Sequence, residues 1–180
     1  MTNTIKAKRI NQITTFLKSL NIKSKRFSEM IKREDISLIQ DFNQAFIHSS
    51  EDKIINYEKL EFFGDAVLRL AASNFIEKKY PQMSVGERSE LRAQIVSDEW
   101  LTKLGKTIGI EKLIIKGPKA LGDENSKNTI VGDSTEALIG ALYKCFNSIQ
   151  EVNLWLDDIW EEDSEIFLNC LLYTSDAADE

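Results

Sequence analysis

The sequence predicts an all-α protein built as one domain. Apolar residues recur at intervals of three and four along nearly the whole chain, a spacing that places them on one face of a helix. Sustained apolar–polar alternation and Asn-Gly or Asp-Gly turns, which indicate strands and hairpins, are absent from the sequence. A length of 180 residues, 42% of them hydrophobic, suits one domain with a core, and 8 Gly and 2 Pro exclude a collagen-like or linker-like chain.

The N-terminal half of the chain holds three predicted helices. Apolar residues within 10–20 recur at helical spacing in a basic segment, which fits either a packed helix or an amphipathic presequence. We favour the packed helix and, with it, a cytoplasmic protein. A second helix covers 36–46 and ends at the polar cluster 48–52, and a third spans 57–80, where Pro81 closes it.

Capping residues and glycines set the boundaries of the next two predicted helices. Either Ser84 or Ser89 is the N-cap of the first of them. Asp98 starts the second, which stops at either Gly105 or Gly109. The spacing of apolar residues is compatible with each of these alternatives.

The last predicted helices follow a break at Gly117-Pro118 and a polar loop at 121–127. The helix over 129–146 carries small residues, Gly140 among them, which allow another helix to pack very closely. An acidic amphipathic stretch then extends to Leu168.

Charge and composition narrow the function further. The formal net charge of −6 conceals +8 over residues 1–33 and −10 over 151–180, so the basic segment is either a phosphate-binding patch or a solvated helix face. The single histidine, His48, excludes His-rich zinc sites, and we interpret it as structural. Two cysteines exclude a disulfide framework and favour a reducing compartment. No apolar run reaches the ~20 residues of a membrane span, so we expect no membrane partner.

The candidate chemistry lies in carboxylates on two predicted helices. Glu58, Glu61 and Asp65 stand at i, i+3 and i+7, within about 60° on one helix face and about 10 Å from end to end. Asp133 and Glu136 stand at i and i+3 on the other helix, and each group has a glycine beside it. This pattern predicts either a site for a hard cation, Mg²⁺ or Mn²⁺, that serves phosphoryl chemistry, or a solvated acidic face.

The same segments resemble the signature of the ribonuclease III family, in its bacterial, cyanobacterial form. The segment Asn56-Tyr-Glu-Lys-Leu-Glu-Phe-Phe-Gly-Asp-Ala-Val-Leu68 carries the resemblance. In order and spacing the resemblance extends over about residues 10–160, through the segments 45–50, 89–97 and 132–140.

The resemblance implies the all-α endonuclease-domain fold over residues 1–160, working as a homodimer. It implies Mg²⁺ as the cofactor, with Mn²⁺ able to substitute. The implied metal ligands are Glu61, Asp65, Asp133 and Glu136, of which Asp65 and Glu136 are the most directly catalytic. Further expected roles are a supporting acid for substrate or metal at Glu58, an aromatic dimer contact at Phe62, and contacts to the scissile phosphate at Lys127 and Asn128, for which a solvated loop is an equal alternative.

The activity implied is hydrolysis of double-stranded RNA by metal-activated water, with one strand cut by each subunit, in rRNA and mRNA processing. The products would carry 5′-phosphate and 3′-hydroxyl ends with short 3′ overhangs. Two other functions stay open. One is a catalytically inactive RNA-binding or dimerisation module of the same fold, and the other is an acidic helical interaction protein whose carboxylates bind nothing.

The sequence departs from the family pattern in two places. Val85 precedes Gly86, where many members of the family have Glu. No residue is therefore assigned to hold a second metal ion, and the nearest acid is Glu87. We also expect the C-terminal double-stranded-RNA-binding domain of the family to be absent from this chain. Residues 170–180 look like a sequencing-library adapter translated in frame, so we expect a truncated chain, a linker that starts at 161–169, and a net charge of −3 without this tail.

Overall fold

The computed structural model is all-α, as predicted. It describes residues 6–33, 36–120 and 126–176, and side chains within 6–33, 38–118, 120 and 126–163. That part of the chain contains eight α-helices, two 3₁₀ turns and no strand. The helices are α1 (Ala7–Ser19), α2 (Lys25–Lys32), α3 (Ile36–Gln44), α4 (Glu58–Lys79), α5 (Val85–Ile95), α6 (Asp98–Ile108), α7 (Lys127–Phe146) and α8 (Ile149–Asp176), and the 3₁₀ turns are η1 (Ile110–Lys112) and η2 (Pro118–Ala120).

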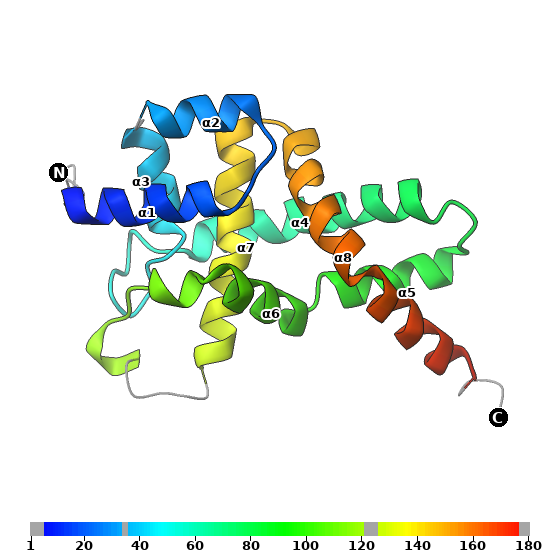
Figure 1. Cartoon of the computed structure of the whole chain (residues 1–180). Helices are drawn as coiled ribbons and strands as arrows, with labels where there is room; N and C mark the ends of the chain where they lie inside the picture. The colour runs from blue at the N-terminus through cyan, green and yellow to red at the C-terminus, as the bar shows by residue number, and fades with distance from the viewer. Residues whose placement is uncertain (1–5, 34–35, 121–125, 177–180) are drawn as a thin grey trace.

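The centre of the fold is the crossing of α4 and α7, which form the most extensive helix pair of the described chain (Figure 1). A Cβ atom on Gly64 would overlap the main-chain carbonyl of Glu136, and one on Gly140 would overlap the carbonyl of Leu60. The two helix backbones are therefore in direct contact, which only glycine permits at these two positions. The predicted close packing at Gly140 is confirmed.

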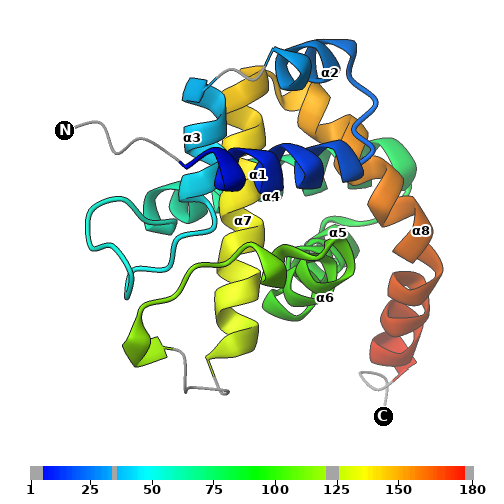
Figure 2. The ribbon, with the colours of Figure 1, turned by 60° about the vertical axis from the view of Figure 1, so that its left-hand side comes forward.

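The other helices surround this crossing. In Figures 1 and 2, α1–α3 lie around one end of α7, α6 packs across its other half, and α5 and α8 pack against the far end of α4. Ile13 and Leu17 of α1 are fully buried, so the N-terminal segment is a packed helix of the core, as favoured above. None of the described helices is both long enough and apolar enough to span a membrane.

The structure decides between the alternative helix boundaries. The Ser84 side chain accepts a hydrogen bond from the Glu87 N–H (3.3 Å), and the Glu87 carboxylate accepts one from the Ser84 N–H (2.7 Å). This reciprocal cap starts α5 at Ser84 rather than Ser89. Helix α6 passes through Gly105 and ends at Gly109, whose φ of 84° lies in the left-handed region that glycine favours.

Two segments differ from the sequence-based expectation. Helix α2, capped by Ser24, was not predicted, because its buried residues Phe27 and Ile31 make up a single apolar turn among basic residues. Residues 161–169, expected to begin a linker, continue α8, which extends to Asp176. The non-native origin of residues 170–180 stays a prediction.

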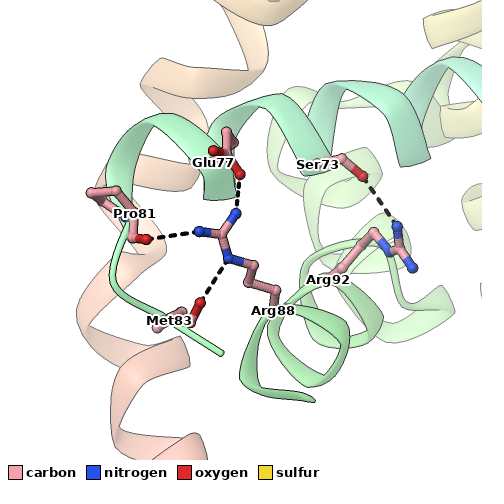
Figure 3. A network of polar contacts seen from close by, with 6 residues as sticks. All are labelled: Ser73, Glu77, Pro81, Met83, Arg88 and Arg92. Carbon is pink, nitrogen blue, oxygen red and sulfur yellow. Dashed lines mark hydrogen bonds and ion pairs between the residues drawn. The ribbon is translucent and has the colours of Figure 1, made fainter. Parts of the chain in front are cut away.

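The turn from α4 into α5 is held by one arginine (Figure 3). The Arg88 guanidinium donates hydrogen bonds to the carbonyls of Met83 (2.9 Å) and Pro81 (2.8 Å) and forms an ion pair with Glu77 near the end of α4. Arg92, one turn further along α5, donates to the Ser73 hydroxyl at 3.2 Å. These contacts fix the direction in which α5 leaves α4.

Candidate active site

The helix crossing brings together the two groups of acids that the sequence singled out. Glu61 and Asp65 flank Gly64 on α4, and the main chain of Glu136 on α7 packs directly against Gly64. Asp133 lies one turn before Glu136 on the same helix. Acids about 70 positions apart in the chain thus lie near the same helix crossing, because two glycines, which have no side chains, let the helices approach closely.

Burial and mutual repulsion raise the pKa values of several of these carboxylates. Burial first, and then the charges of Asp65, Glu61, Asp133 and Asp98, raise the pKa of Glu136 to about 7. Burial, and then the charges of Asp133 and Glu58, raise the pKa of Glu61 to about 7. Burial also raises the pKa of Asp133. Ionising both Glu61 and Glu136 at neutral pH is therefore unfavourable unless a cation offsets their charge.

Two of the four acids have hydrogen-bond partners of their own. Both carboxylate oxygens of Asp65 accept from Arg69 Nε, at 2.7 and 2.9 Å. Asp133 Oδ2 accepts from the Tyr57 hydroxyl at 3.0 Å, and burial raises the pKa of Tyr57, which keeps this hydroxyl protonated. In the part of the chain with described side chains, no three Asp, Glu, His or Cys groups converge closely enough to hold one ion. The acids are gathered at the crossing without forming a closed ligand shell.

The chemistry of this donor set fits a hard divalent cation. Its groups are carboxylate oxygens, which Mg²⁺ and Mn²⁺ prefer. His48 is committed elsewhere, since its Nδ1 accepts the Ser50 N–H at 3.0 Å and lies 2.7 Å from the Ser50 hydroxyl. That contact agrees with the structural interpretation of His48.

The other predicted site residues lie at the N-terminal ends of α4 and α7. Glu58 is exposed in the first turn of α4, where its N–H donates to Asn56 Oδ1 at 3.0 Å. Lys127 and Asn128 are exposed in the first turn of α7; Lys127 Nζ lies 3.7 Å from Glu111, and Asn128 Oδ1 accepts from Lys106 Nζ at 2.7 Å. Their contact with a substrate stays a prediction.

A groove of about 580 Å³ lies between α6 and the start of α7. Its lining includes Asn128, Lys103 and Lys106, together with Asp98, whose charge acts on Asp133 and Glu136. From the sequence, Asp98 was predicted only as the start of a helix, because the local sequence does not show that this helix end lies near Asp133 and Glu136. The groove connects basic side chains to the edge of the carboxylate set.

At the start of α5, Val85 stands where the family pattern has an acid. Val85 is 81% exposed and supplies no ligand. Glu87 does not replace the missing acid at this position, because its side chain caps α5 through Ser84, and that contact lowers the pKa of Glu87.

An apolar surface lies beside the acids on α4. Phe62 is 84% exposed, and Ile54 and Ile55 in the preceding loop are exposed as well. Together with Phe63 they line a groove of about 590 Å³ that also includes Lys144. Exposure of a large aromatic side chain within an apolar groove is typical of a contact surface.

The raised carboxylate pKa values predict how stability depends on pH without metal. With folded-state values of about 7, Glu61 and Glu136 bind protons more tightly in the folded than in the unfolded chain, where the value is 4.5. The free energy of unfolding in EDTA therefore falls as pH rises from about 4.5 to 7, by about 1 kcal/mol for each group after allowing for solvent screening. Urea unfolding across this range measures the slope.

The control for this experiment is the chain with both Glu61→Gln and Glu136→Gln. His48 acts in the opposite direction in the same pH range, because burial lowers its pKa. The difference between the wild-type and double-variant curves isolates the two carboxylates. Parallel curves would contradict the assigned burial and charge coupling of Glu61 and Glu136.

The fold and the site define a class: an all-α domain whose two central helices meet at glycines and present carboxylates suited to a hard cation. A family model described as Ribonuclease-III-like matches residues 40–153. The chain therefore belongs to the ribonuclease-III-like family, as the resemblance predicted.

Individual relatives agree with this assignment. Ribonuclease 3 of Prochlorococcus marinus is 45% identical over 161 residues, 89% of this chain and 64% of that protein. Ribonuclease 3 2 of Synechocystis sp. is 42% identical over 114 residues, 63% of this chain and 47% of that protein. The chain thus spans between about half and two thirds of the length of these curated relatives.

Solved structures show the same fold. The nuclease domain of ribonuclease III from Campylobacter jejuni superposes with a TM-score of 0.63 at 26% identity, covering 85% of this chain and 96% of that one. Dicer from Pichia stipitis superposes with a TM-score of 0.57 at 26% identity, over 74% of this chain and 57% of that one. The predicted endonuclease-domain fold is confirmed.

Proposed function

We propose that this chain is the nuclease domain of an endonuclease that cleaves double-stranded RNA, including rRNA and mRNA precursors. The observation that carries the proposal is the α4–α7 crossing, where Gly64 and Gly140 let the two helices that carry the four carboxylates pack backbone to backbone, in a chain of this family. The proposed ligands of a divalent cation are Glu61, Asp65, Asp133 and Glu136.

A cation bound there would supply Lewis-acid activation of water and would offset negative charge on the phosphate oxygens. The protein groups have separate tasks. The crossing holds the helix backbones that carry Asp65 and Glu136 against each other. The raised pKa values of Glu61 and Glu136 mean that these two carboxylates would ionise fully when a cation is bound. Arg69 must leave Asp65 for both oxygens of that side chain to become available.

The proposed path of the RNA backbone is the groove between α6 and α7. Lys103 and Lys106 line it beside Asn128, and Lys127 lies at the adjacent N-terminus of α7, where the helix dipole favours phosphate. A-form RNA is recognised mainly through its backbone and 2′-hydroxyls, so charged groups spaced along a groove are a suitable contact. Glu58, in the first turn of α4, is proposed to act at the edge of the site.

The test of this function is cleavage of a perfect RNA duplex with Mg²⁺ and with EDTA. We expect cuts with Mg²⁺ or Mn²⁺, none with EDTA, and products with 5′-phosphate ends. A failure to cut at low salt and high protein concentration, combined with a gel shift of the duplex in Ca²⁺, would instead identify a non-catalytic RNA-binding module. If the duplex is neither cut nor bound, the result would support a helical interaction protein.

We further propose that two copies of the chain associate through the apolar surface around Phe62. The nuclease domain of C. jejuni ribonuclease III forms dimers, and this chain exposes an aromatic side chain beside a groove lined by Ile54, Ile55 and Phe63. Replacing Phe62 with Ala is expected to weaken dimerisation by about 100-fold, since buried aromatic anchors contribute most to such interfaces. Sedimentation equilibrium measures this change.

The matched control for the dimer is Leu70→Ala, which removes another exposed apolar side chain of α4 outside that groove. We expect its dissociation constant to stay near the wild-type value. A wild-type chain that is monomeric at micromolar concentration would exclude the two-strand mechanism.

A further inference from the structure

Tyr57, the residue that precedes α4, is held by hydrogen bonds of the two neighbouring loops. The Ile115 N–H donates to the Phe46 carbonyl at 2.8 Å, and the His48 N–H donates to the Ile115 carbonyl at 2.9 Å. These two bonds join the segment after α3 to the segment after η1. The Tyr57 N–H then donates to the Ile47 carbonyl at 2.9 Å, so the main chain of Tyr57 is tied to this junction.

The Tyr57 side chain is fixed as firmly as its main chain. It is only 4% exposed, and its ring meets the His48 ring edge to face with centroids 5.6 Å apart. The His48 ring is itself held through Ser50, whose hydroxyl accepts the Gly117 N–H at 3.0 Å. From this position the Tyr57 hydroxyl reaches across to α7 and donates to Asp133 Oδ2 at 3.0 Å.

We propose that Tyr57 is a positioning residue that orients the Asp133 carboxylate for cation binding. This inference rests on the proposed function, because it assumes that Asp133 is a metal ligand. A hydrogen bond from a buried donor, whose ring and main chain are both held by neighbouring groups, restricts the rotation of the Asp133 carboxylate and engages its Oδ2. Partners of this kind orient metal ligands, and their loss typically weakens metal affinity 10- to 100-fold.

The substitution Tyr57→Phe tests the proposal, because it retains the ring and its contact with His48 and removes only the hydroxyl. The matched control is Tyr80→Phe, which makes the same change at the end of α4, where the Tyr80 ring packs against Phe75. Binding of Mn²⁺ is followed by the electron paramagnetic resonance signal of the free ion, without RNA. We expect about 10-fold weaker Mn²⁺ binding for Tyr57→Phe and unchanged binding for Tyr80→Phe.

Kinetics separate positioning from a general loss of structure. For Tyr57→Phe, the Mg²⁺ concentration that gives half-maximal cleavage should rise by about the same factor of 10, while kcat at saturating Mg²⁺ and KM for RNA stay near wild type. A lower kcat at saturating Mg²⁺ without a change in Mn²⁺ affinity would overturn the proposal.

A double variant shows whether Tyr57 acts through Asp133. In an Asp133→Asn background, Tyr57→Phe should cause no further loss of Mn²⁺ affinity, whereas additive losses would contradict the proposal. Binding of Mn²⁺ distinguishes the role of Tyr57 from the existence of the metal site. Equal Mn²⁺ affinity in wild type and Tyr57→Phe overturns the role of Tyr57 alone, and a wild-type chain that binds no Mn²⁺ overturns the metal site together with it.

Discussion

Replacing Glu136 with Gln is expected to reduce RNA cleavage by about 1,000-fold or more while leaving the fold intact. Glu136 is the acid whose pKa is raised by burial and by the charges of Asp65, Glu61 and Asp133 together. The amide has nearly the same shape as the carboxylate and carries no charge to hold a cation. Initial rates on a labelled RNA duplex in Mg²⁺ measure the loss.

The same substitution is expected to stabilise the metal-free protein. At pH 8 the Glu136 carboxylate is ionised in the folded chain although burial and its neighbours raise its pKa to about 7. Gln removes that unfavourable charge, so the free energy of unfolding in EDTA should rise by about 1 kcal/mol after solvent screening. Urea unfolding measures this gain, and binding of the duplex in Ca²⁺ should persist.

Glu29→Gln is the control for this pair of effects. Glu29 is exposed on α2, away from the α4–α7 crossing, and we expect wild-type cleavage and stability within about 0.5 kcal/mol. Normal cleavage by the Glu136→Gln variant would show that the active site has been assigned to the wrong residues.

The second large effect is expected for Gly64→Ala. The added methyl group would overlap the Glu136 carbonyl, which belongs to a helix backbone and cannot rotate away as a side chain can. We expect a loss of about 3 kcal/mol in the free energy of unfolding, a substantial share of the 5–15 kcal/mol typical of a domain. Cleavage should fall as well, because the helices must separate and carry their acids apart. Urea unfolding and initial rates measure the two losses.

Gly86→Ala is the matched control for Gly64→Ala. Gly86 also lies within a helix, but a Cβ atom there would meet only the Ser84 hydroxyl, at 3.9 Å. Since alanine has the higher helix propensity, we expect this variant to gain about 0.5–1 kcal/mol. Equal effects of the two substitutions would mean that the crossing does not depend on backbone contact at Gly64.

The sequence predicted helix ranges accurately where apolar residues recur at helical spacing over many residues. Helices α4 and α7 occupy nearly the expected ranges, 57–80 and 129–146. Helix α2 was missed, because two buried residues, Phe27 and Ile31, are too few to form a periodic pattern. The choice of Ser84 over Ser89 as the cap of α5 depends on reciprocal hydrogen bonds that the residue types alone do not specify.

The candidate site was only partly predictable. Helical spacing places Glu61 with Asp65 and Asp133 with Glu136, because that spacing is a property of the local backbone. Tyr57 and Asp98 belong to the surroundings of the acids through contacts across the fold, and their neighbours in sequence do not indicate this. Glu87 was expected only as the acid nearest to Val85, and the structure commits its side chain to the cap of α5.

The helical class, the family and the acids that two helices present follow from the sequence alone, since each of these depends on residues close together in the chain. That the two groups of acids meet depends on how the helices pack. Their meeting depends on the fit of Gly64 against Glu136 and of Gly140 against Leu60, a backbone contact between helices far apart in sequence. Helix packing also sets the protonation of the carboxylates, because the burial that raises the pKa values of Glu61 and Glu136 arises only when the helices pack.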